Sequence, residues 1–425
     1  MRTDELEMSS RKGLLSAVLA VLLGAACYLW ENVPLSYGES FDNLYFAERF
    51  IQSHFGQKKQ IDDGLFINVG YDKAIGEIDL YGLNGLFIGH VDITDRQTLD
   101  RLLARLEADN TYKYILLDVR FEKEIKTPYD STLFSRIYRM RDIVVATHHD
   151  IQLASPLLKE KAALSDFKTT ITSTGFTRYQ FIQGGQSSIA LKMYEDLTGN
   201  GIHKIGPLYV SDRHLCYNSL FIRIPEDFSE NLVGISGNDN TGMLRQRYYD
   251  CGPQIDEDFP LGEKANGKIV IIGDFVNDVA GTYMGEQPNP YLTFLSYKSL
   301  IDGRHKVKYL FVPLLLVYFF AMFLSMLLGN GHPMIRRIIH FLAKLTKIIH
   351  EIVTGDLNNR KIETQRISIG NFFWNFVGYS VDMFVISLLL FLLFNITFSV
   401  FIPSTVFSVV SAIVDSQGEN GEDIV

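Results

Sequence analysis

The stretch Tyr114-Ile115-Leu116-Leu117-Asp118-Val119 decides the fold, because it is almost continuously apolar. A strand with one solvated face would alternate apolar and polar residues, so such a run indicates a strand covered on both faces. Similar runs occur at Leu65 to Val69, Ile143 to Ala146 and Lys268 to Ile272. We therefore expect a sheet whose strands are buried above and below.

Helical sequence separates these strands. Thr94 or Asp95 can cap a helix, and a second helical stretch runs from Ser131 to Met140. Further helices are expected near Ser187 to Leu197 and from Pro290 to Ile301. The apolar positions of the first helix recur at helical spacing: Leu99, Leu102, Leu103 and Leu106. The strand–helix–strand–helix–strand order predicts an α/β fold with a largely parallel sheet.

Three uncharged apolar runs frame this domain, and each is about as long as the ~20 residues that a helix needs to cross a bilayer. The predicted order is a short N-terminus (1–12), a first transmembrane helix (13–30), a large domain (31–308), a second transmembrane helix (309–328), a basic linker (329–370), a membrane-associated region (371–414) with a third helix (383–402), and an acidic tail (415–425).

Charge predicts the orientation in the membrane. Arg2, Arg11 and Lys12 precede the first run, and the next cation after it is Arg49. Positive residues favour the cytoplasmic side, and the linker is also basic. We expect a multi-pass protein of a bacterial inner membrane with its large domain in the periplasm. The cations just before the second run disagree, although large domains cross largely regardless of charge.

Two of the apolar runs have alternative interpretations. The first could be a cleaved signal peptide, and Gly24-Ala25-Ala26-Cys27 faintly resembles a lipoprotein box, but the terminal Tyr28-Leu29-Trp30 favours a retained helix. The third region is apolar from Phe372 to Val414, with interruptions at Asp382, Asn395 and Pro403. One helix is the simplest solution there, and a second crossing stays open.

Composition limits the function. The chain of 425 residues has a net charge of −9 and no basic tail, which argues against nucleic-acid binding. In an oxidising compartment Cys216 and Cys251 could pair, or they could stay half-buried thiols; spacing alone leaves both open.

The order of elements resembles the second class of CHASE domain, an extracellular sensor of bacterial kinases and cyclases. The stretches that carry the resemblance are Leu65 to Lys73, Ile115 to Asp118 with Phe121, Asp130 with Leu133 and Phe134, Ile143 to Thr147, and Lys268 to Gly273 with Asp278 and Thr282. The resemblance covers about Ser36 to Gly303 and the flanking helices. The sequences of Asn68 to Lys73 and Ile93 to Arg96 resemble those of the same domain in Bacteroidetes-type bacteria.

The resemblance implies a ligand-sensing domain, but the chain departs from the family pattern. Gly89 to Arg96 lacks the usual Trp and Pro, and Tyr283 stands where a Pro is common. Family members usually carry a cytoplasmic output domain, whereas only the linker is found here. The output of the signal is therefore left open.

Three aspartates are candidates for ligand binding. Asp72, Asp118 and Asp278 each follow a predicted strand, and ligands of open α/β sheets bind at the carboxyl ends of strands. Such aspartates more often cap helices and turns. At His148-His149-Asp150 adjacent side chains would point to opposite faces, so no metal site or cofactor is expected. Nucleophile and phosphate-binding motifs are missing from the sequence, and no enzymatic activity is predicted.

The linker contains a basic amphipathic segment from Met334 to Val353. Its apolar side chains share one helical face, and Arg336, Arg337, Lys344 and Lys347 lie largely on the other. Such a helix can lie on an anionic membrane surface, or it can bind a partner or a second copy of itself.

The leading hypothesis is a membrane-anchored sensor. It would detect an unknown periplasmic ligand or envelope partner and signal through its membrane helices to a separate cytoplasmic or membrane protein. The alternatives are a structural scaffold or subunit of an envelope complex, and an extracytoplasmic hydrolase. Sequence does not name the ligand, the output partner or the oligomeric state.

Overall fold

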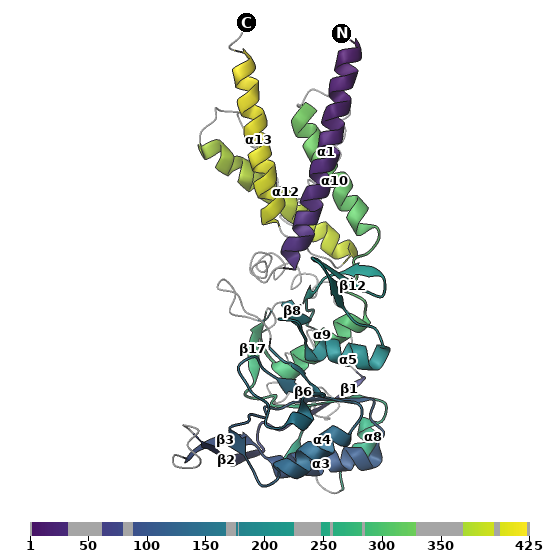
Figure 1. The fold of residues 1–425 in the computed structure, drawn as a ribbon, viewed down its shortest axis with the longest axis vertical. Helices are drawn as coiled ribbons and strands as arrows, with labels where there is room; N and C mark the ends of the chain where they lie inside the picture. Colours follow the sequence, from purple (N-terminus) through teal and green to yellow (C-terminus); the bar gives the residue numbers. More distant parts are fainter. Residues whose placement is uncertain are drawn as a thin grey trace, which may run out of the picture. The chain divides into compact units, whose positions relative to one another are not determined.

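The computed structural model has two compact units, which we describe separately (Figure 1). The α/β unit comprises 48–306, and the helical unit comprises 1–47 together with 307–425. The structure describes residues 2–32, 62–79, 88–166, 176, 178–224, 248–255, 258–282, 285–328, 369–394 and 400–422.

A parallel sheet forms the centre of the α/β unit. In the described part of the chain its strands lie in the order β15 (Tyr248–Asp250), β1 (Gly64–Asn68), β16 (Ile269–Gly273), β4 (Tyr114–Asp118), β6 (Ile143–Thr147) and β7 (Ala162–Leu164). All neighbouring pairs in this sheet are parallel. The predicted strands and their parallel pairing are confirmed. The late strand β16 lies between β1 and β4, with Ile272 opposite both Ile67 and Leu117.

Helices cover both faces of this sheet (Figure 1). On one face lie α3 (Arg96–Asp109), α4 (Asp130–Arg139) and α8 (Leu261–Ala265), and on the other lie α5 (Ile189–Thr198) and α9 (Asn289–Ile301). Successive side chains of a strand point to opposite faces of the sheet. Ile67 packs in the core beneath α3, whereas the ring of Phe66 contacts Phe294 of α9. The burial of every β4 residue follows from this double covering.

The predicted start of α3 is confirmed at Asp95. The carboxylate of Asp95 accepts hydrogen bonds from the backbone N–H of Gln97 at 3.0 Å and from the hydroxyl of Thr98 at 2.6 Å. Such a cap replaces partners that the first N–H groups of a helix lack. At the other end Asn110 adopts a left-handed conformation with φ of 47°, which stops the helix.

Small antiparallel pieces surround the main sheet. Near the amino end, β2 (Lys73–Asp79) pairs with both β3 (Ile88–Thr94) and β5 (Ile125–Lys126). The second half contains the pairs β8 (Arg178–Gln180) with β14 (Ser219–Phe221), β9 (Ile182–Gln183) with β10 (Gln186–Ser187), and β17 (Val279–Thr282) with β18 (Gly285–Pro288). It also holds the sheet of β11 (His203–Ile205), β12 (Leu208–Ser211) and β13 (His214–Cys216). The short helices are η2 (Pro156–Leu158) and α7 (Cys251–Gln254).

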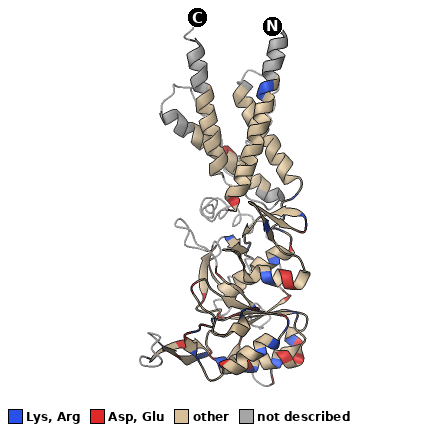
Figure 2. Ribbon diagram, viewed as in Figure 1, with Lys and Arg blue, Asp and Glu red and all other residues tan. Residues whose placement is uncertain are grey.

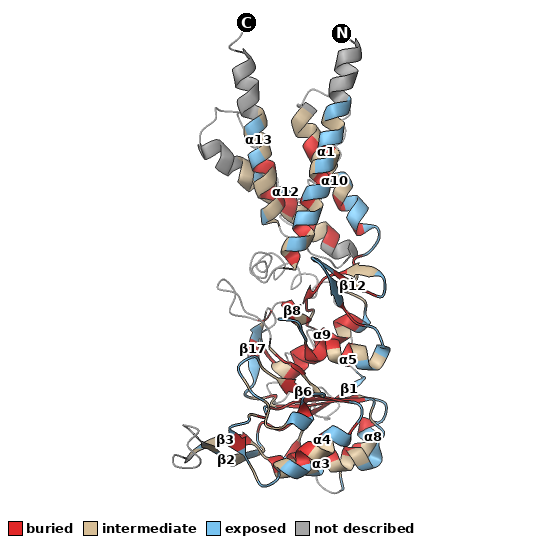
Figure 3. Ribbon diagram, in the orientation of Figure 1, coloured by how far each residue is buried: buried red, intermediate tan, exposed pale blue. Residues whose placement is uncertain are grey.

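The helical unit consists of α1 (Arg2–Glu31), α10 (Phe311–Leu328), α12 (Ile369–Phe394) and α13 (Phe401–Glu422) in the described part of the chain. Within it, α1 lies along α10 and α12 along α13. Charges are sparse on these helices (Figure 2). Many of their positions are exposed (Figure 3), and apolar residues such as Leu14, Leu22 and Val317 are among the exposed ones. Of the described helices, one segment, Ser10–Glu31, is both long and apolar enough to cross a membrane. The apolar segments Phe311–Leu327, Asn375–Leu390 and Phe401–Val414 are shorter.

The prediction of a single helix over 383–402 is wrong. Helix α12 ends at Phe394, and α13 begins at Phe401 and packs back against it. The ring of Phe376 contacts the ring of Phe401, which a continuous helix would place far away. Pro403 explains the restart, because a proline in the first turn costs no hydrogen bond, whereas in a continuous helix it would remove one.

Several predicted features fall elsewhere or are not described. The basic segment with Arg336, Arg337, Lys344 and Lys347 lies outside the described residues. Cys216 and Cys251 both remain buried thiols, so the disulfide that the sequence left open does not form. Burial raises the pKa of each of these thiols to about 12, so neither is a reactive thiolate at neutral pH.

Candidate functional site

Polar residues lie at or just after the carboxyl ends of the parallel strands. In spatial order across the sheet they are Asp250 at the end of β15, Asn68 at the end of β1, Asp274 after β16, Asp118 at the end of β4, His148 after β6, and Ser165 with Asp166 after β7. Because the strands run parallel, these residues gather at one edge of the sheet, where ligands of open α/β folds bind. They divide into two groups with different properties.

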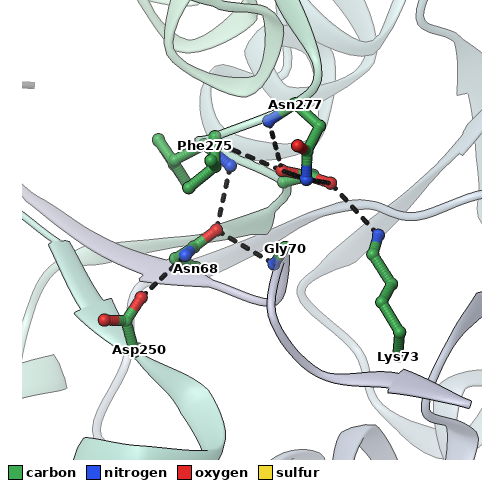
Figure 4. A network of polar contacts seen from close by, with 8 residues as sticks. Asn68, Gly70, Lys73, Asp250, Phe275 and Asn277 are labelled. Atoms are coloured by element: carbon green, nitrogen blue, oxygen red, sulfur yellow. Dashed lines mark hydrogen bonds and ion pairs between the residues drawn. The ribbon is translucent and has the colours of Figure 1, made fainter.

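The first group is a closed network around Asn68 (Figure 4). The Asn68 amide donates to Asp250 at 2.7 Å, and its oxygen accepts the backbone N–H groups of Gly70 and Phe275, each at 3.0 Å. Asn68 is fully buried. The amide therefore joins the ends of β15, β1 and β16, and its polar atoms are all used in holding the strands.

Asp274 continues this network. Its carboxylate accepts from the backbone N–H groups of Val276 and Asn277 at 3.0 and 2.8 Å, and from Lys73 at 3.1 Å. Although burial alone would raise the pKa of Asp274, the hydrogen bonds from Asn277, Val276 and Lys73 outweigh it and lower that pKa. With these hydrogen bonds Asp274 fixes the loop that follows β16. We therefore regard the network around Asn68 and Asp274 as structural.

Asp72 belongs beside the structural network. Its pKa is raised by burial and by the charges of Asp250 and Asp95, while a hydrogen bond from the backbone of Gly252 opposes that rise. Of the three candidate aspartates, Asp118 and Asp278 therefore act on each other, whereas the carboxylates that act on Asp72 are Asp250 and Asp95. Asp72 lies against Gly252 of α7, the helix that directly follows the edge strand β15.

The second group centres on Asp118. This side chain is 9% exposed, and one carboxylate oxygen accepts a hydrogen bond from Ser165 at 3.1 Å. The other oxygen, Oδ2, is buried and has no hydrogen-bond partner among the described residues. Burial and the nearby charge of Asp278 raise the pKa of Asp118 to about 7, against the opposing effects of His148, Ser165 and Arg120.

Asp278 stands at the rim of this group. Its carboxylate accepts a hydrogen bond from the Asn289 amide at 2.6 Å, and its backbone carbonyl accepts the Asn289 N–H at 2.9 Å. Desolvation by the surrounding protein raises the pKa of Asp278 although part of the residue is exposed, and Asn289 and Arg120 offset some of the rise. Asn289 is the first residue of α9, so Asp278 is tied to the start of that helix.

His148 and Asp166 form an ion pair at the far side of Asp118. The Nδ1 atom of His148 lies 2.6 Å from Asp166, which also accepts the backbone N–H of His149 at 2.8 Å. Burial would lower the pKa of His148, but Asp166 and Asp118 outweigh it and raise that pKa. For Asp166, burial is likewise outweighed by the contacts with His148 and His149, which lower its pKa.

Glycine at the end of β16 lets α9 approach the sheet edge. A Cβ atom at Gly273 would lie 2.5 Å from Pro290 and 3.3 Å from Asp118 Cβ. Real Cβ atoms do not come that close, so only glycine permits this position of the helix start. The first turn of α9 is thus held directly against β16, at the residue that pairs with Asp118 of β4.

We call Asp118, Asp278, His148, Asp166 and Arg120 the carboxylate site. Sequence analysis singled out Asp118 and Asp278, which the structure brings together, but it missed Asp166, Ser165, Asn289 and Arg120. The short apolar strand β7, just before Ser165, could have revealed Ser165 and Asp166. It adds one more strand to the parallel sheet and so brings the residues after it to the same edge. No group of three or more His, Cys, Asp or Glu side chains among the described residues is arranged to hold a metal ion.

No protein-family model, curated protein or solved structure matches this chain. The resemblance to a CHASE domain therefore stays a prediction.

Replacing Asp118 by asparagine should change the pH dependence of stability. Because the folded-state pKa of Asp118 is about 7 and exceeds its ordinary value of 3.8, the folded protein binds the extra proton. Its free energy of unfolding therefore falls as pH rises from about 4 to 7. The Asp118→Asn variant lacks this loss, and we expect it to gain about 2 kcal/mol relative to wild type between pH 5 and 7.

Urea unfolding of the full chain in detergent at pH 5, 6 and 7, followed by hydrogen exchange in β4 and β16, measures this difference. Asp142→Asn, at an exposed position in the same unit, is the control. A difference between Asp118→Asn and wild type that stays constant with pH would contradict a raised pKa for Asp118.

Proposed function

We propose that this protein is a membrane-anchored sensor, whose α/β unit binds a ligand outside the cytoplasm at the carboxylate site. One observation carries the proposal. Asp278 accepts hydrogen bonds from Asn289, the first residue of α9, and only residues 302–310 separate the end of α9 from the apolar helix α10. A change at the site therefore has a short covalent route to that helix.

The membrane anchor is argued from the helical unit. Leu14, Val18 and Leu22 of α1 are exposed, and no charge occurs between Lys12 and Glu31. Water would penalise such a surface, whereas lipid would not. Helix α10 has 18 residues, or about 27 Å at the rise of an α-helix, which is near the thickness of the hydrocarbon core. We place α1 and α10 across the inner membrane, with the pair α12 and α13 embedded beside them.

The helix α9 is suited to transmit a shift. It is buried along its length, with residues such as Tyr291, Phe294 and Leu300 fully enclosed. A packed helix moves as a body between discrete arrangements and does not deform gradually. A ligand can bias two such arrangements only by binding them with different affinity. A ligand that alters the Asp278–Asn289 contact would bind the two arrangements with different affinity, because that contact lies at the start of the helix.

The output would pass to a separate protein through the basic segment from Met334 to Val353. Its charged and apolar faces suit either the inner leaflet or a partner helix.

Photo-crosslinking tests the proposal. With a benzoylphenylalanine at Lys344, ultraviolet light should capture one cytoplasmic or membrane protein in living cells. Asn289→Ala removes the side-chain hydrogen bond between α9 and the Asp278 carboxylate, so we expect it to change the captured yield at least threefold. Asn266→Ala, at an exposed position in the same unit, is the matched control and should leave the yield unchanged.

A captured yield that Asn289→Ala does not alter would contradict the sensor and favour the scaffold, which should associate in fixed stoichiometry. The side of the membrane is checked in the same strain with Lys126→Cys, since Lys126 is exposed in the α/β unit. Labelling of this cysteine by a membrane-impermeant maleimide is expected in spheroplasts; labelling only after lysis would contradict the orientation.

A further inference from the structure

Some buried oxygen atoms in and beside the carboxylate site accept no hydrogen bond from the described residues. Oδ2 of Asp118 and Oε1 of Gln183 are buried without hydrogen-bond partners among the described residues, and Gln183 is 1% exposed. The Gln183 amide donates to the backbone oxygen of Asp166 at 2.7 Å, which places this side chain beside the His148–Asp166 pair. Oδ1 of Asn289 is a third buried oxygen of this kind.

An unmatched buried acceptor is costly, so its persistence at a sheet edge points to a missing donor. Three acceptors from β4, β9 and the start of α9 call for a group that carries several N–H bonds. Two carboxylates, Asp118 and Asp278, influence each other electrostatically here. A positively charged donor would satisfy the oxygens and relieve that repulsion, whereas an anion would add to it.

Arg120 supplies the opposite charge at the same edge. It follows β4 by two residues, is exposed, and acts electrostatically on Asp118, Asp278 and His148. No described carboxylate lies within ion-pair distance of its guanidinium. An arginine beside a carboxylate pair can bind the anionic end of a ligand whose cationic end faces the carboxylates.

We propose that the carboxylate site binds a small zwitterion of the α-amino-acid class, with its ammonium group on Asp118 and Asp278 and its carboxylate on Arg120. This assignment rests on the proposed function for its biological role, and on the residues above for its chemistry. A primary ammonium has three N–H donors, enough to reach Asp118 Oδ2 together with an amide oxygen of Gln183 or Asn289.

The experiment uses the full chain in detergent at pH 8, with each of the twenty standard L-amino acids at 10 mM as probe. We expect at least one to raise the thermal midpoint and to slow hydrogen exchange at the ends of β4 and β16. For that amino acid, the analogue without the amine and the analogue without the carboxylate should both bind at least tenfold more weakly.

Three variants examine the contacts. Asp118→Asn and Arg120→Gln should each weaken binding roughly tenfold or more, since each removes a charge-assisted contact. Arg141→Gln, at an exposed position after α4, is the matched control and should bind as wild type does. Because Asp118 must be ionised to take the ammonium, and Asp278, His148 and Arg120 surround it, binding should be about tenfold weaker at pH 6 than at pH 8.

The possible results test the ligand class separately from the proposed sensor function. If none of the twenty binds, or if the analogue without the amine binds equally well, the ligand class is wrong, even where Asn289→Ala still changes the captured yield. If an amino acid binds as expected but does not alter crosslinking at Lys344, the ligand class stands and the sensor is wrong. Equal binding by Arg120→Gln and wild type would overturn the role of Arg120.

Discussion

Replacing Asn68 by alanine is expected to lower the free energy of unfolding of the α/β unit by about 3–5 kcal/mol, since each buried donor left unpaired costs about 1–3 kcal/mol. The variant would leave the backbone N–H groups of Gly70 and Phe275 without their acceptor, and Asp250 without the amide donor. Of the three joined strands, β15 is the edge strand, but β1 and β16 lie inside the sheet, so loss of the network also loosens its interior.

Hydrogen exchange in β1 and β16, measured on the full chain in detergent across a urea series, reports this loss directly. Tryptophan fluorescence would miss it, because Trp30 and Trp374 both lie outside 48–306. The control is Asn277→Ala: Asn277 is exposed, and Asp274 keeps its bonds to Lys73 and the backbone. A loss below about 1 kcal/mol for Asn68→Ala would show that water replaces the amide and would refute the structural role.

Replacing Leu103 by alanine should destabilise the same unit by about 2–5 kcal/mol, the range for deleting a fully buried leucine side chain. Leu103 is completely buried in α3, in the core that includes Ile67 and Leu117 of the sheet. The cavity would remain partly open because strands fixed on both sides by hydrogen bonds cannot collapse into it.

Arg101→Ala on the exposed face of α3 is the matched control, and it should change stability by no more than about 0.5 kcal/mol. Urea midpoints followed by hydrogen exchange in α3 and β4 give both values. Equal effects of Leu103→Ala and Arg101→Ala would mean that α3 does not cover the sheet, and the core described above would be wrong.

Sequence predicted the central sheet well because burial on two faces leaves a strong pattern. The apolar runs that became β1, β4, β6 and β16, and the leucines of α3, needed no knowledge of distant contacts. The capping aspartate Asp95 was also visible, because its role depends only on neighbours a few residues away.

The arrangement of the site depended on information that the local pattern lacks. That Asp118 would meet Asp278, and that Asp72 would not, follows from the strand order, in which β16 separates β1 from β4. Asp166 follows a strand of only three residues, too short for its pattern to stand out. The break before Phe401 was marked only by Asn395 and Pro403, which a single apolar helix over 383–402 passed over.

The position of β16 has a consequence for how this protein is made. Strands β1 and β4 have no direct pairing, and the strand that bridges them is synthesised more than a hundred residues later. Until the chain has been synthesised past Gly273, β1 and β4 each have an unpaired backbone edge, with which strands of other chains could pair. Until β16 arrives, such a chain is open to misassembly, and its maturation would end in a late, cooperative closure of the sheet.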